Sequence, residues 1–286
     1  MIDTKLGLHI NVFGAPWRAN TRGKIPSVRD SIRKAAEIGY EGVEIPIWLL
    51  VTPRIGPNRR DLEDRVSLRS LIEDLGLDLF AIGGYVNFAS REKRDEMLKT
   101  FKENLRLASD IGARIVVTHA GRGSSSQSLE EIFSLTIDAL NECIEEAENL
   151  GVKIGLENHG SLYNSEPILK IIRSIDSKYI GAVLDPVNML ILQRRFLGKI
   201  VEWPLESVYK MGGDLIHIHL FDYRIVDGQV SYVDPGDGDL DLQEFLSRLK
   251  NIGYSGDISI EYKGESLENP EEYSRKLYLK MQKYLR

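Results

Sequence analysis

Residues 215–220 have the sequence LIHIHL, in which aliphatic residues and histidines alternate. Successive side chains of a β-strand point to opposite faces, so three aliphatic residues share one face while His217 and His219 share the other. An aliphatic face of this kind packs against helices, because it is removed from water there. The stretch therefore predicts a strand of a helix-covered sheet, with both histidines on the face that the helices do not cover.

The same unit, a short apolar strand followed by a helical segment, recurs along the chain. The helical segments have apolar residues at helical spacing, and glycines such as Gly39, Gly112, Gly151 and Gly253 follow them, where a left-handed residue ends a helix. The strand candidates are residues 6–13, 42–45, 77–82, 114–119, 153–157, 181–185, 215–220 and 257–262. Eight such units in 286 residues predict one α/β domain over residues 1–286, a (β/α)8 TIM barrel.

An open, doubly wound sheet is the alternative for alternating strands and helices. A nucleotide-binding sheet of that kind carries a glycine-rich turn after its first strand, which is absent here, and no Walker A sequence occurs. Gly121-Arg122-Gly123 follows the fourth strand candidate, but Ser126 occupies the position of the third glycine. No clear phosphate cradle is therefore predicted, and we expect an unphosphorylated ligand.

The composition limits the partners and the compartment. The chain has 37 basic and 43 acidic residues and a formal net charge of −6, which argues against nucleic acid or an anionic membrane as a partner. Cys143 is the only cysteine, so no disulfide forms within the chain, which favours a reducing compartment. The sequence has no apolar run long enough to span a membrane and no signal peptide, so we expect a cytoplasmic protein.

Polar residues occur at the ends of four successive strand candidates. Alternation places Glu157, Asp185, His219 and Glu261 on the interior face, at the C-terminal mouth of the barrel. Three carboxylates in a confined site need a compensating positive charge. Carboxylates with one imidazole suit Mn²⁺ or Mg²⁺, and Co²⁺ or Zn²⁺ also bind such ligands. The alternative is four separate polar residues that make local hydrogen bonds to loops.

Five motifs around these residues follow one another in order: LENHG (156–160), LDPVN (184–188), IHIHLFD (216–222), PGDGDL (235–240) and IEYKG (260–264). They resemble the sugar phosphate isomerase/epimerase family of xylose-isomerase-like TIM barrels, which includes ketose 3-epimerases and inosose dehydratases. The resemblance spans most of the chain. It implies one divalent metal ion, foremost Mn²⁺, bound by Glu157, Asp185, His219 and Glu261. It also implies that Glu157 and Glu261 flank the carbon whose proton moves, and that the protein is a homodimer or homotetramer.

Three positions depart from the ketose 3-epimerase pattern. Asn188 stands where many epimerases have a substrate-contacting histidine, Phe221 where a lysine is common, and Tyr163 where a second glutamate is usual. These departures concern the reaction and the substrate. The metal ligands follow the family pattern.

Further side chains are candidates for substrate binding: Asn188, Arg224, His119, His159, Glu44 and Trp48. Arg224 could instead be a solvated surface residue, and His119 a hydrogen-bonded core histidine. Glu44 could make a structural hydrogen bond, and Trp48 could pack in its loop or at a subunit contact. His217 lies below His219 and is expected to support it or to belong to the core. Asp222 is expected to organise the loop after the strand.

The resemblance implies a metal-dependent sugar isomerase or epimerase that acts on a small keto-sugar or polyol. In such a reaction the metal stabilises an enediolate, one glutamate removes a proton and the other returns it from the opposite face. An inosose-type dehydratase would use the same residues and release water. Two further classes are an AP-endonuclease-like enzyme, which needs more histidines than the five of this chain, and a non-catalytic sugar binder.

Overall fold

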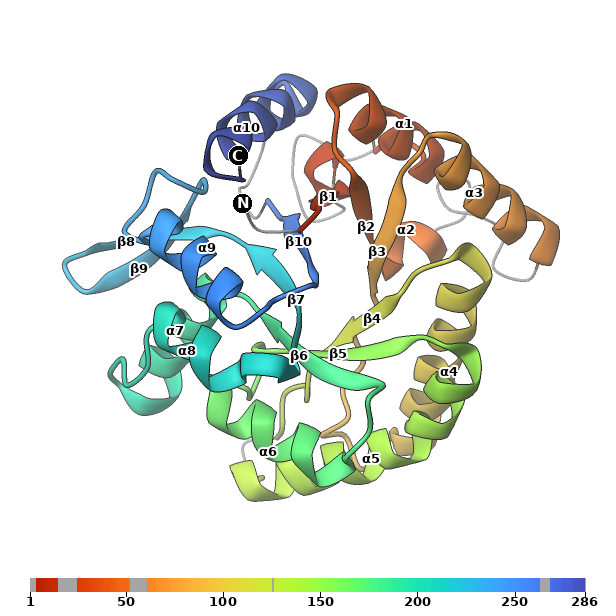
Figure 1. The fold of residues 1–286 in the computed structure, drawn as a ribbon. Coiled ribbons are helices and arrows are strands. Elements are labelled where there is room, and N and C mark those ends of the chain that lie inside the picture. The colour runs from red at the N-terminus through yellow and green to blue at the C-terminus, as the bar shows by residue number, and fades with distance from the viewer. Residues whose placement is uncertain (1–3, 15–24, 52–60, 125, 263–267, 286) are drawn as a thin grey trace.

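The computed structural model describes residues 4–14, 25–51, 61–124, 126–262 and 268–285. Its barrel strands are β1 (Leu6–His9), β2 (Gly42–Pro46), β3 (Asp78–Gly83), β4 (Ile115–Thr118), β5 (Lys153–Glu157), β6 (Ile180–Leu184), β7 (Leu215–Leu220) and β10 (Asp257–Ile260). They are parallel and follow the order β1-β10-β7-β6-β5-β4-β3-β2 around a closed barrel (Figure 1). The first and last strands pair with each other, which closes the sheet. The predicted (β/α)8 barrel is confirmed.

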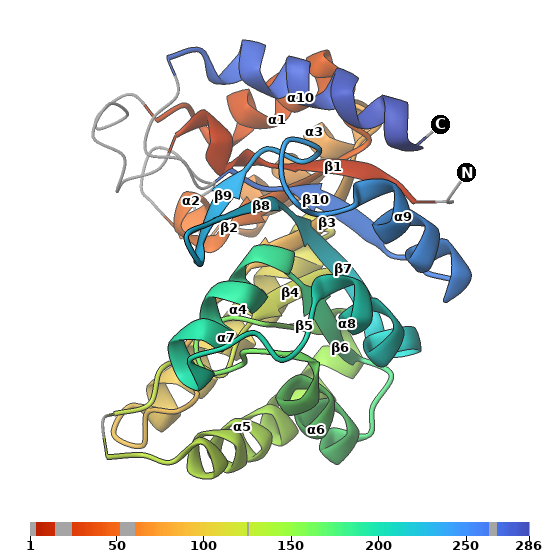
Figure 2. The ribbon, with the colours of Figure 1, turned by 90° about the vertical axis from the view of Figure 1, so that its left-hand side faces the viewer.

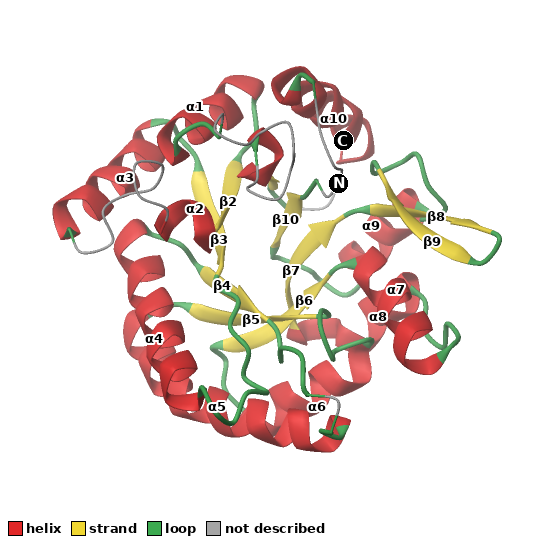
Figure 3. Ribbon diagram, turned by 180° about the vertical axis from the view of Figure 1, so that it is seen from behind, coloured by secondary structure: helices red, strands yellow, loops and turns green. Residues whose placement is uncertain are grey.

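Helices surround the barrel, as the views from the side and from behind show (Figures 2 and 3). They are α1 (Val28–Ile38), α2 (Ile47–Val51), α3 (Leu62–Asp74), α4 (Arg94–Ile111), α5 (Leu129–Leu150), α6 (Ser165–Ile175), α7 (Pro186–Leu197), α8 (Pro204–Met211), α9 (Leu242–Asn251) and α10 (Pro270–Leu285). Among the described residues, the 3-10 helix η1 (Ile10–Phe13) directly follows β1, and η3 (Gly212–Asp214) directly precedes β7. Within the described residues, none of the helices has the length and apolar character needed to cross a bilayer.

The helix ends follow the signals in the sequence. Gly39, Gly112 and Gly151 have φ values of 113°, 84° and 67° and end α1, α4 and α5, as predicted. The hydroxyl of Ser128 caps the start of α5 by accepting a hydrogen bond from the Glu131 amide. These caps fix where each helix turns back into the next strand.

Two segments differ from the sequence-based expectation. The strand predicted for residues 6–13 ends at His9, because the Asn11 amide donates to His9 Nδ1 and the chain winds into η1. After β7, the strands β8 (Asp222–Val226) and β9 (Gln229–Val233) form an antiparallel hairpin that was not predicted. The hairpin extends outward beside α7 and α9 (Figure 1).

Two register shifts change which side chains line the barrel. Phe80 is an extra residue that has no partner in the β2–β3 register, and Ile216 is the extra residue in the β6–β7 register. We name as the inner cluster the buried apolar residues Ala81, Ile115, Val117 and Val183. Val183 pairs with His217 and so shares its face. The predicted helix-facing position of Ile216 is wrong, because the extra residue breaks the alternation and Ile216 packs on the inner cluster.

The Phe80 side chain lies close to His217, and two glycines leave space for its ring. A Cβ on Gly7 would lie 2.4 Å from the ring, and one on Gly42 would lie 2.3 Å from it. The ring centroid is 6.4 Å from that of His217, and the side chain is 0% exposed. Because Phe80→Ala would leave a cavity, we expect it to lower the free energy of unfolding by about 3–5 kcal/mol, measured by urea denaturation.

Phe196 on α7 is the matched control for this substitution, since it is 42% exposed. Phe196→Ala is expected to change the free energy of unfolding by less than about 1 kcal/mol. Equal losses in the two variants would contradict a packed Phe80 inside the barrel.

Candidate active site

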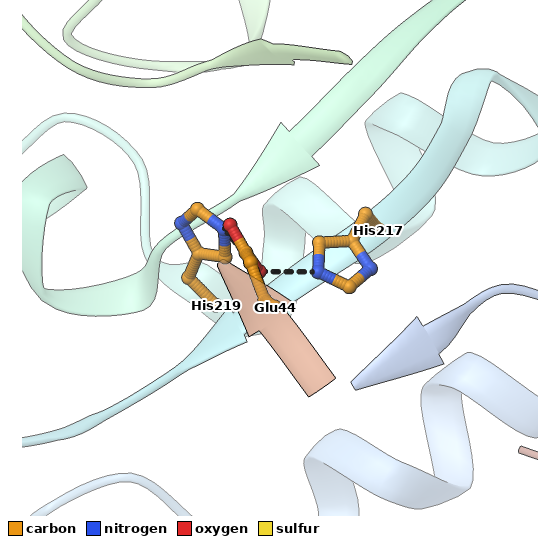
Figure 4. A group of neighbouring side chains, drawn as sticks. All are labelled: Glu44, His217 and His219. Carbon is orange, nitrogen blue, oxygen red and sulfur yellow. Dashed lines mark hydrogen bonds and ion pairs between the residues drawn. The ribbon is translucent and has the colours of Figure 1, made fainter. Parts of the chain in front are cut away.

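Glu44, His217 and His219 form a buried group in the barrel (Figure 4). Glu44 lies on β2 and both histidines lie on β7, and all three are 0% exposed. His217 Nε2 is 3.0 Å from Glu44 Oε2, and His219 Nε2 is 3.0 Å from Glu44 Oε1. One ligand-type atom from each residue lies within 4.8 Å of the others, so the group could hold a metal ion. The predicted inward orientation of both histidines is confirmed.

Opposite charges stabilise this group. Burial alone would raise the pKa of Glu44, but the charge of His219 and hydrogen bonds from both histidines hold that pKa well below its usual value. Burial alone would lower the pKa of His219, but the carboxylates of Glu44 and Glu157 raise it well above its usual value. The carboxylates are thus stable in the interior only with a shared positive charge, carried by a proton or by a metal ion.

Glu157, the last residue of β5, lies on the other side of His219. Glu157 Oε1 is 3.2 Å from His219 Nδ1 and accepts a hydrogen bond from Asn188 Nδ2 at 3.3 Å. Asn188, in the first turn of α7, accepts in turn from the Tyr232 hydroxyl at 2.6 Å. The two ring nitrogens of His219 therefore face two different carboxylates, Glu157 at Nδ1 and Glu44 at Nε2.

Asp185 directly follows β6 and caps the start of α7. Its Oδ1 accepts from the amides of Val187 and Asn188 at 2.9 and 2.8 Å. The Asn158 side chain donates to the Asp185 carbonyl and accepts from the Asp185 amide, at 2.7 Å in each case. A carboxylate has two oxygens, so capping through Oδ1 is compatible with a ligand role for the other oxygen.

Glu261 directly follows β10, and its Oε1 accepts from Asn11 Nδ2 at 3.2 Å. The charges of Glu261 and Glu157 both affect the Tyr85 hydroxyl. Burial of the Tyr85 hydroxyl raises its pKa well above the usual value, and the charges of Glu157 and Glu261 add to this effect. The Tyr85 side chain is nevertheless 37% exposed, so it lies where the barrel mouth meets solvent. The charges of both predicted acid–base residues therefore raise the pKa of the same hydroxyl at the mouth.

The two histidines predicted to contact substrate, His119 and His159, stack at 4.8 Å between ring centroids. Tyr85 also stacks on His119 at 5.2 Å, and its ring centroid lies 6.4 Å from that of His159. His119 Nδ1 accepts from the Gly121 amide at 2.8 Å. Burial, and then the neighbouring His159, lower the pKa of His119 to about 4, so this imidazole is neutral at neutral pH.

Arg224 and Trp48 have other surroundings. Arg224 is exposed on β8, and its guanidinium donates to the carbonyl oxygen of Asp237 in the loop before α9. Trp48 is half-buried on α2 and packs against the main hydrophobic core. Arg224 therefore stabilises the loop before α9, and Trp48 packs α2 against the hydrophobic core.

Asp222 holds the hairpin that carries Tyr232. Its carboxylate accepts hydrogen bonds of 2.7 to 3.0 Å from the backbone amides of Tyr223, Gly236, Gly238 and Leu240. A Cβ on Gly238 would lie 2.1 Å from Asp222 Oδ1, so the close approach requires glycine. The predicted role of Asp222 in organising this loop is confirmed.

Asn11, Tyr85 and Tyr232 were not singled out from the sequence. Asn11 lies in η1 just after β1, and Tyr85 lies just after β3, at the same end of the barrel as Glu157. Tyr85 could have been found among the aromatic residues that follow a strand candidate, whereas Asn11 lies within the candidate 6–13. Tyr232 could not be found in this way, because it reaches Asn188 from a hairpin that the strand pattern does not predict.

A family model described as a xylose isomerase-like TIM barrel matches residues 32–284. The chain belongs to this family. Its sequence is 30% identical over 275 residues to "Uncharacterized protein MJ1311" of Methanocaldococcus jannaschii, covering 92% of this chain and 85% of that protein. Inosose isomerase of Bacillus subtilis is 27% identical over 205 residues, 68% of each chain. Inosose dehydratase of Geobacillus kaustophilus is 21% identical over 270 residues, covering 85% of this chain and 83% of that protein.

Solved structures share the xylose isomerase-like fold. A D-tagatose 3-epimerase-like protein has a TM-score of 0.75 at 24% identity, over 99% of this chain and 97% of that chain. The IOLI protein with a bound zinc atom has a TM-score of 0.75 at 22% identity, over 98% of this chain and 99% of that chain. The resemblance found in the five motifs is thereby confirmed, and the named relatives are isomerases, epimerase-like proteins and dehydratases.

Proposed function

We propose that this chain is a metal-dependent sugar isomerase or epimerase that moves a proton on a small keto-sugar or polyol, with Glu157 and Glu261 as acid and base. The observation that supports this most directly is the position of His219 between two carboxylates, Glu157 at Nδ1 and Glu44 at Nε2. The relatives named inosose isomerase and inosose dehydratase support a polyol ketone as the kind of ligand.

The proposed ligands of a divalent ion are Glu157, Asp185, His219 and Glu261, whereas the group of three ligand-type atoms within 4.8 Å among the described residues is Glu44, His217 and His219. A histidine that binds a metal through one nitrogen usually donates the other N–H to a carboxylate. Glu44 at Nε2 fits that supporting position, which leaves Nδ1 on the side of Glu157. Glu261 is only partly buried and so gives this set access to the mouth. We propose Mn²⁺ first, with Mg²⁺, Co²⁺ or Zn²⁺ as alternatives.

Glu44, His217 and His219 are the alternative ligand set. All three are 0% exposed, and His217 Nε2 also lies 3.0 Å from Ser259 Oγ. The proposed set differs from this group by including Glu261, which is partly exposed, so a substrate at the mouth could reach an ion held by the proposed set. We therefore assign Glu44 and His217 to the support of His219.

Two glutamates are proposed to carry out the proton transfer, each oriented by an asparagine. When bound, a divalent ion polarises a substrate carbonyl and stabilises the negative charge of an enediolate. Glu157 and Glu261 would flank the substrate carbon, so that one removes its proton and the other returns it. Asn188 donates to Glu157 and Asn11 donates to Glu261, and these hydrogen bonds orient the two carboxylates.

Metal analysis followed by deuterium exchange tests this proposal. The purified protein is expected to take up about one equivalent of divalent ion, as the four-ligand set implies. It should then incorporate solvent deuterium into at least one member of a panel of ketoses, inososes and polyols in D₂O. Failure to bind any divalent ion supplied in excess would contradict the proposal, and tight sugar binding without exchange would indicate a binding protein.

A dehydratase is the second candidate, since an inosose dehydratase is among the relatives and would use the same residues. The two reactions begin with the same proton removal and differ in whether a hydroxyl group then leaves. Loss of one water mass, with an unsaturated product that absorbs in the ultraviolet, would identify the dehydratase. A product of unchanged mass would identify the isomerase or epimerase.

A further inference from the structure

A cavity of about 490 Å³ opens beside the proposed active site. Its lining includes His159 and Asn188, and Asn188 donates to Glu157. Its lining also includes Arg122, in the loop after β4, and Arg195, near the end of α7. A ligand that fills this cavity would therefore touch the neighbours of Glu157 and at least one guanidinium group.

The described residues include no carboxylate paired with Arg122 or Arg195. The chain has six more acidic than basic charges, and other arginines are paired, for example Arg106 with Glu146 at 2.7 Å. Arg195 instead lies over the ring of Phe196, 5.9 Å from its centroid. Two solvent-exposed arginines that line one cavity without a described acidic partner give its rim a positive charge, opposite to the charge of the carboxylates at the mouth.

The backbone of Arg122 is fixed by Asn87. The Arg122 amide donates to Asn87 Oδ1, and Asn87 Nδ2 donates to the Arg122 carbonyl, both at 3.1 Å. Gly121 has a φ of 88°, and a Cβ there would lie 2.0 Å from Asn87 Oδ1, so this clamp requires glycine. The Ser161 hydroxyl donates to the Gly121 carbonyl at 3.1 Å and ties the loop to the one after β5. Arg122 is therefore presented from a fixed backbone.

We propose that the substrate carries an anionic group, a phosphate or a carboxylate, that Arg122 and Arg195 bind while its ketone end lies against Glu157 and Asn188. This inference rests on the proposed function for the ketone end and adds the chemical class of the other end. Guanidinium groups bind both kinds of anion through charge-assisted hydrogen bonds. The negative mouth and the positive cavity together allow one orientation of such a substrate.

The sequence had favoured an unphosphorylated ligand because it lacks a glycine-rich phosphate motif. That argument applies to phosphates held by consecutive backbone amides. Arg122 lies in the loop after β4 and Arg195 lies on α7, so their approach to one cavity leaves no local pattern in the sequence.

Anion binding to the metal-free protein tests the proposal. The probes are inorganic phosphate, acetate and neutral glycerol, titrated by calorimetry at constant ionic strength. We expect saturable binding of phosphate, acetate or both, with an affinity at least about tenfold lower in the Arg122→Gln/Arg195→Gln double variant. Arg106→Gln, on the outer surface of α4, is the matched control and should leave the affinity unchanged.

The identity of the tighter anion distinguishes a phosphorylated from a carboxylated substrate. Equal affinities in the wild type and the double variant, or no saturable anion binding in the wild type, would overturn the proposal. These readouts need neither metal nor turnover. Failure of the proposed reaction would instead appear as absence of metal uptake and deuterium exchange in a protein that still binds anions through the two arginines.

Discussion

Glu261→Gln is expected to lower solvent-deuterium exchange into the substrate by about 10²–10⁴-fold, the contribution typical of a general acid or base. Glutamine cannot take up the proton, but its carbonyl oxygen can still accept from Asn11, which donates to Glu261 Oε1 at 3.2 Å. Glu261 is partly exposed, so the substitution leaves the buried core intact. The exchange rate is measured by mass spectrometry of substrate and product after incubation in D₂O.

Glu157→Gln should reduce exchange by a similar factor, since both glutamates are proposed as acid or base and as metal ligands. Glu96→Gln, an exposed position on α4, is the matched control and should exchange at the wild-type rate. Undiminished exchange in both Glu157→Gln and Glu261→Gln would remove these residues from the chemistry.

The fold could be predicted because alternation and helix ends are local properties. LIHIHL placed His217 and His219 on the interior face, and Gly39 ended its helix as expected. The alternation rule failed where the pairing between strands determines the face on which a side chain lies. Phe80 and Ile216 are the extra residues of two register shifts, and neither shift has a signal within its own strand.

The candidate site shows the same division. Strand-end positions identified Glu157, and the structure places it next to His219. The contacts of Glu44 with the histidines could not be derived from the sequence, because they depend on the distance between β2 and β7, which do not pair. Tyr232 depends on a hairpin whose partner surface is α7, so its contact with Asn188 also needed the three-dimensional structure.

Glu157→Gln and His217→Gln are expected to separate the two candidate metal sites by their metal content. If the ion lies at His219 Nδ1, Glu157→Gln removes a ligand and should weaken metal binding by more than about 100-fold, beyond the loss typical of a supporting residue. His217 lies 3.0 Å from Glu44 Oε2, and Glu44 in turn orients His219. His217→Gln should therefore weaken binding by no more than the roughly 10–100-fold of a lost supporting contact.

Both variants are titrated with Mn²⁺ and Zn²⁺ by calorimetry, after circular dichroism has confirmed that each is folded. The reverse order of affinities would place the ion among Glu44, His217 and His219. Unlike the proposed set, that group has no partly exposed ligand such as Glu261 through which the ion could contact a substrate at the mouth. Glu157 and Glu261 would then have to ionise without a nearby cation, which would leave the proposed proton transfer without its source of charge stabilisation.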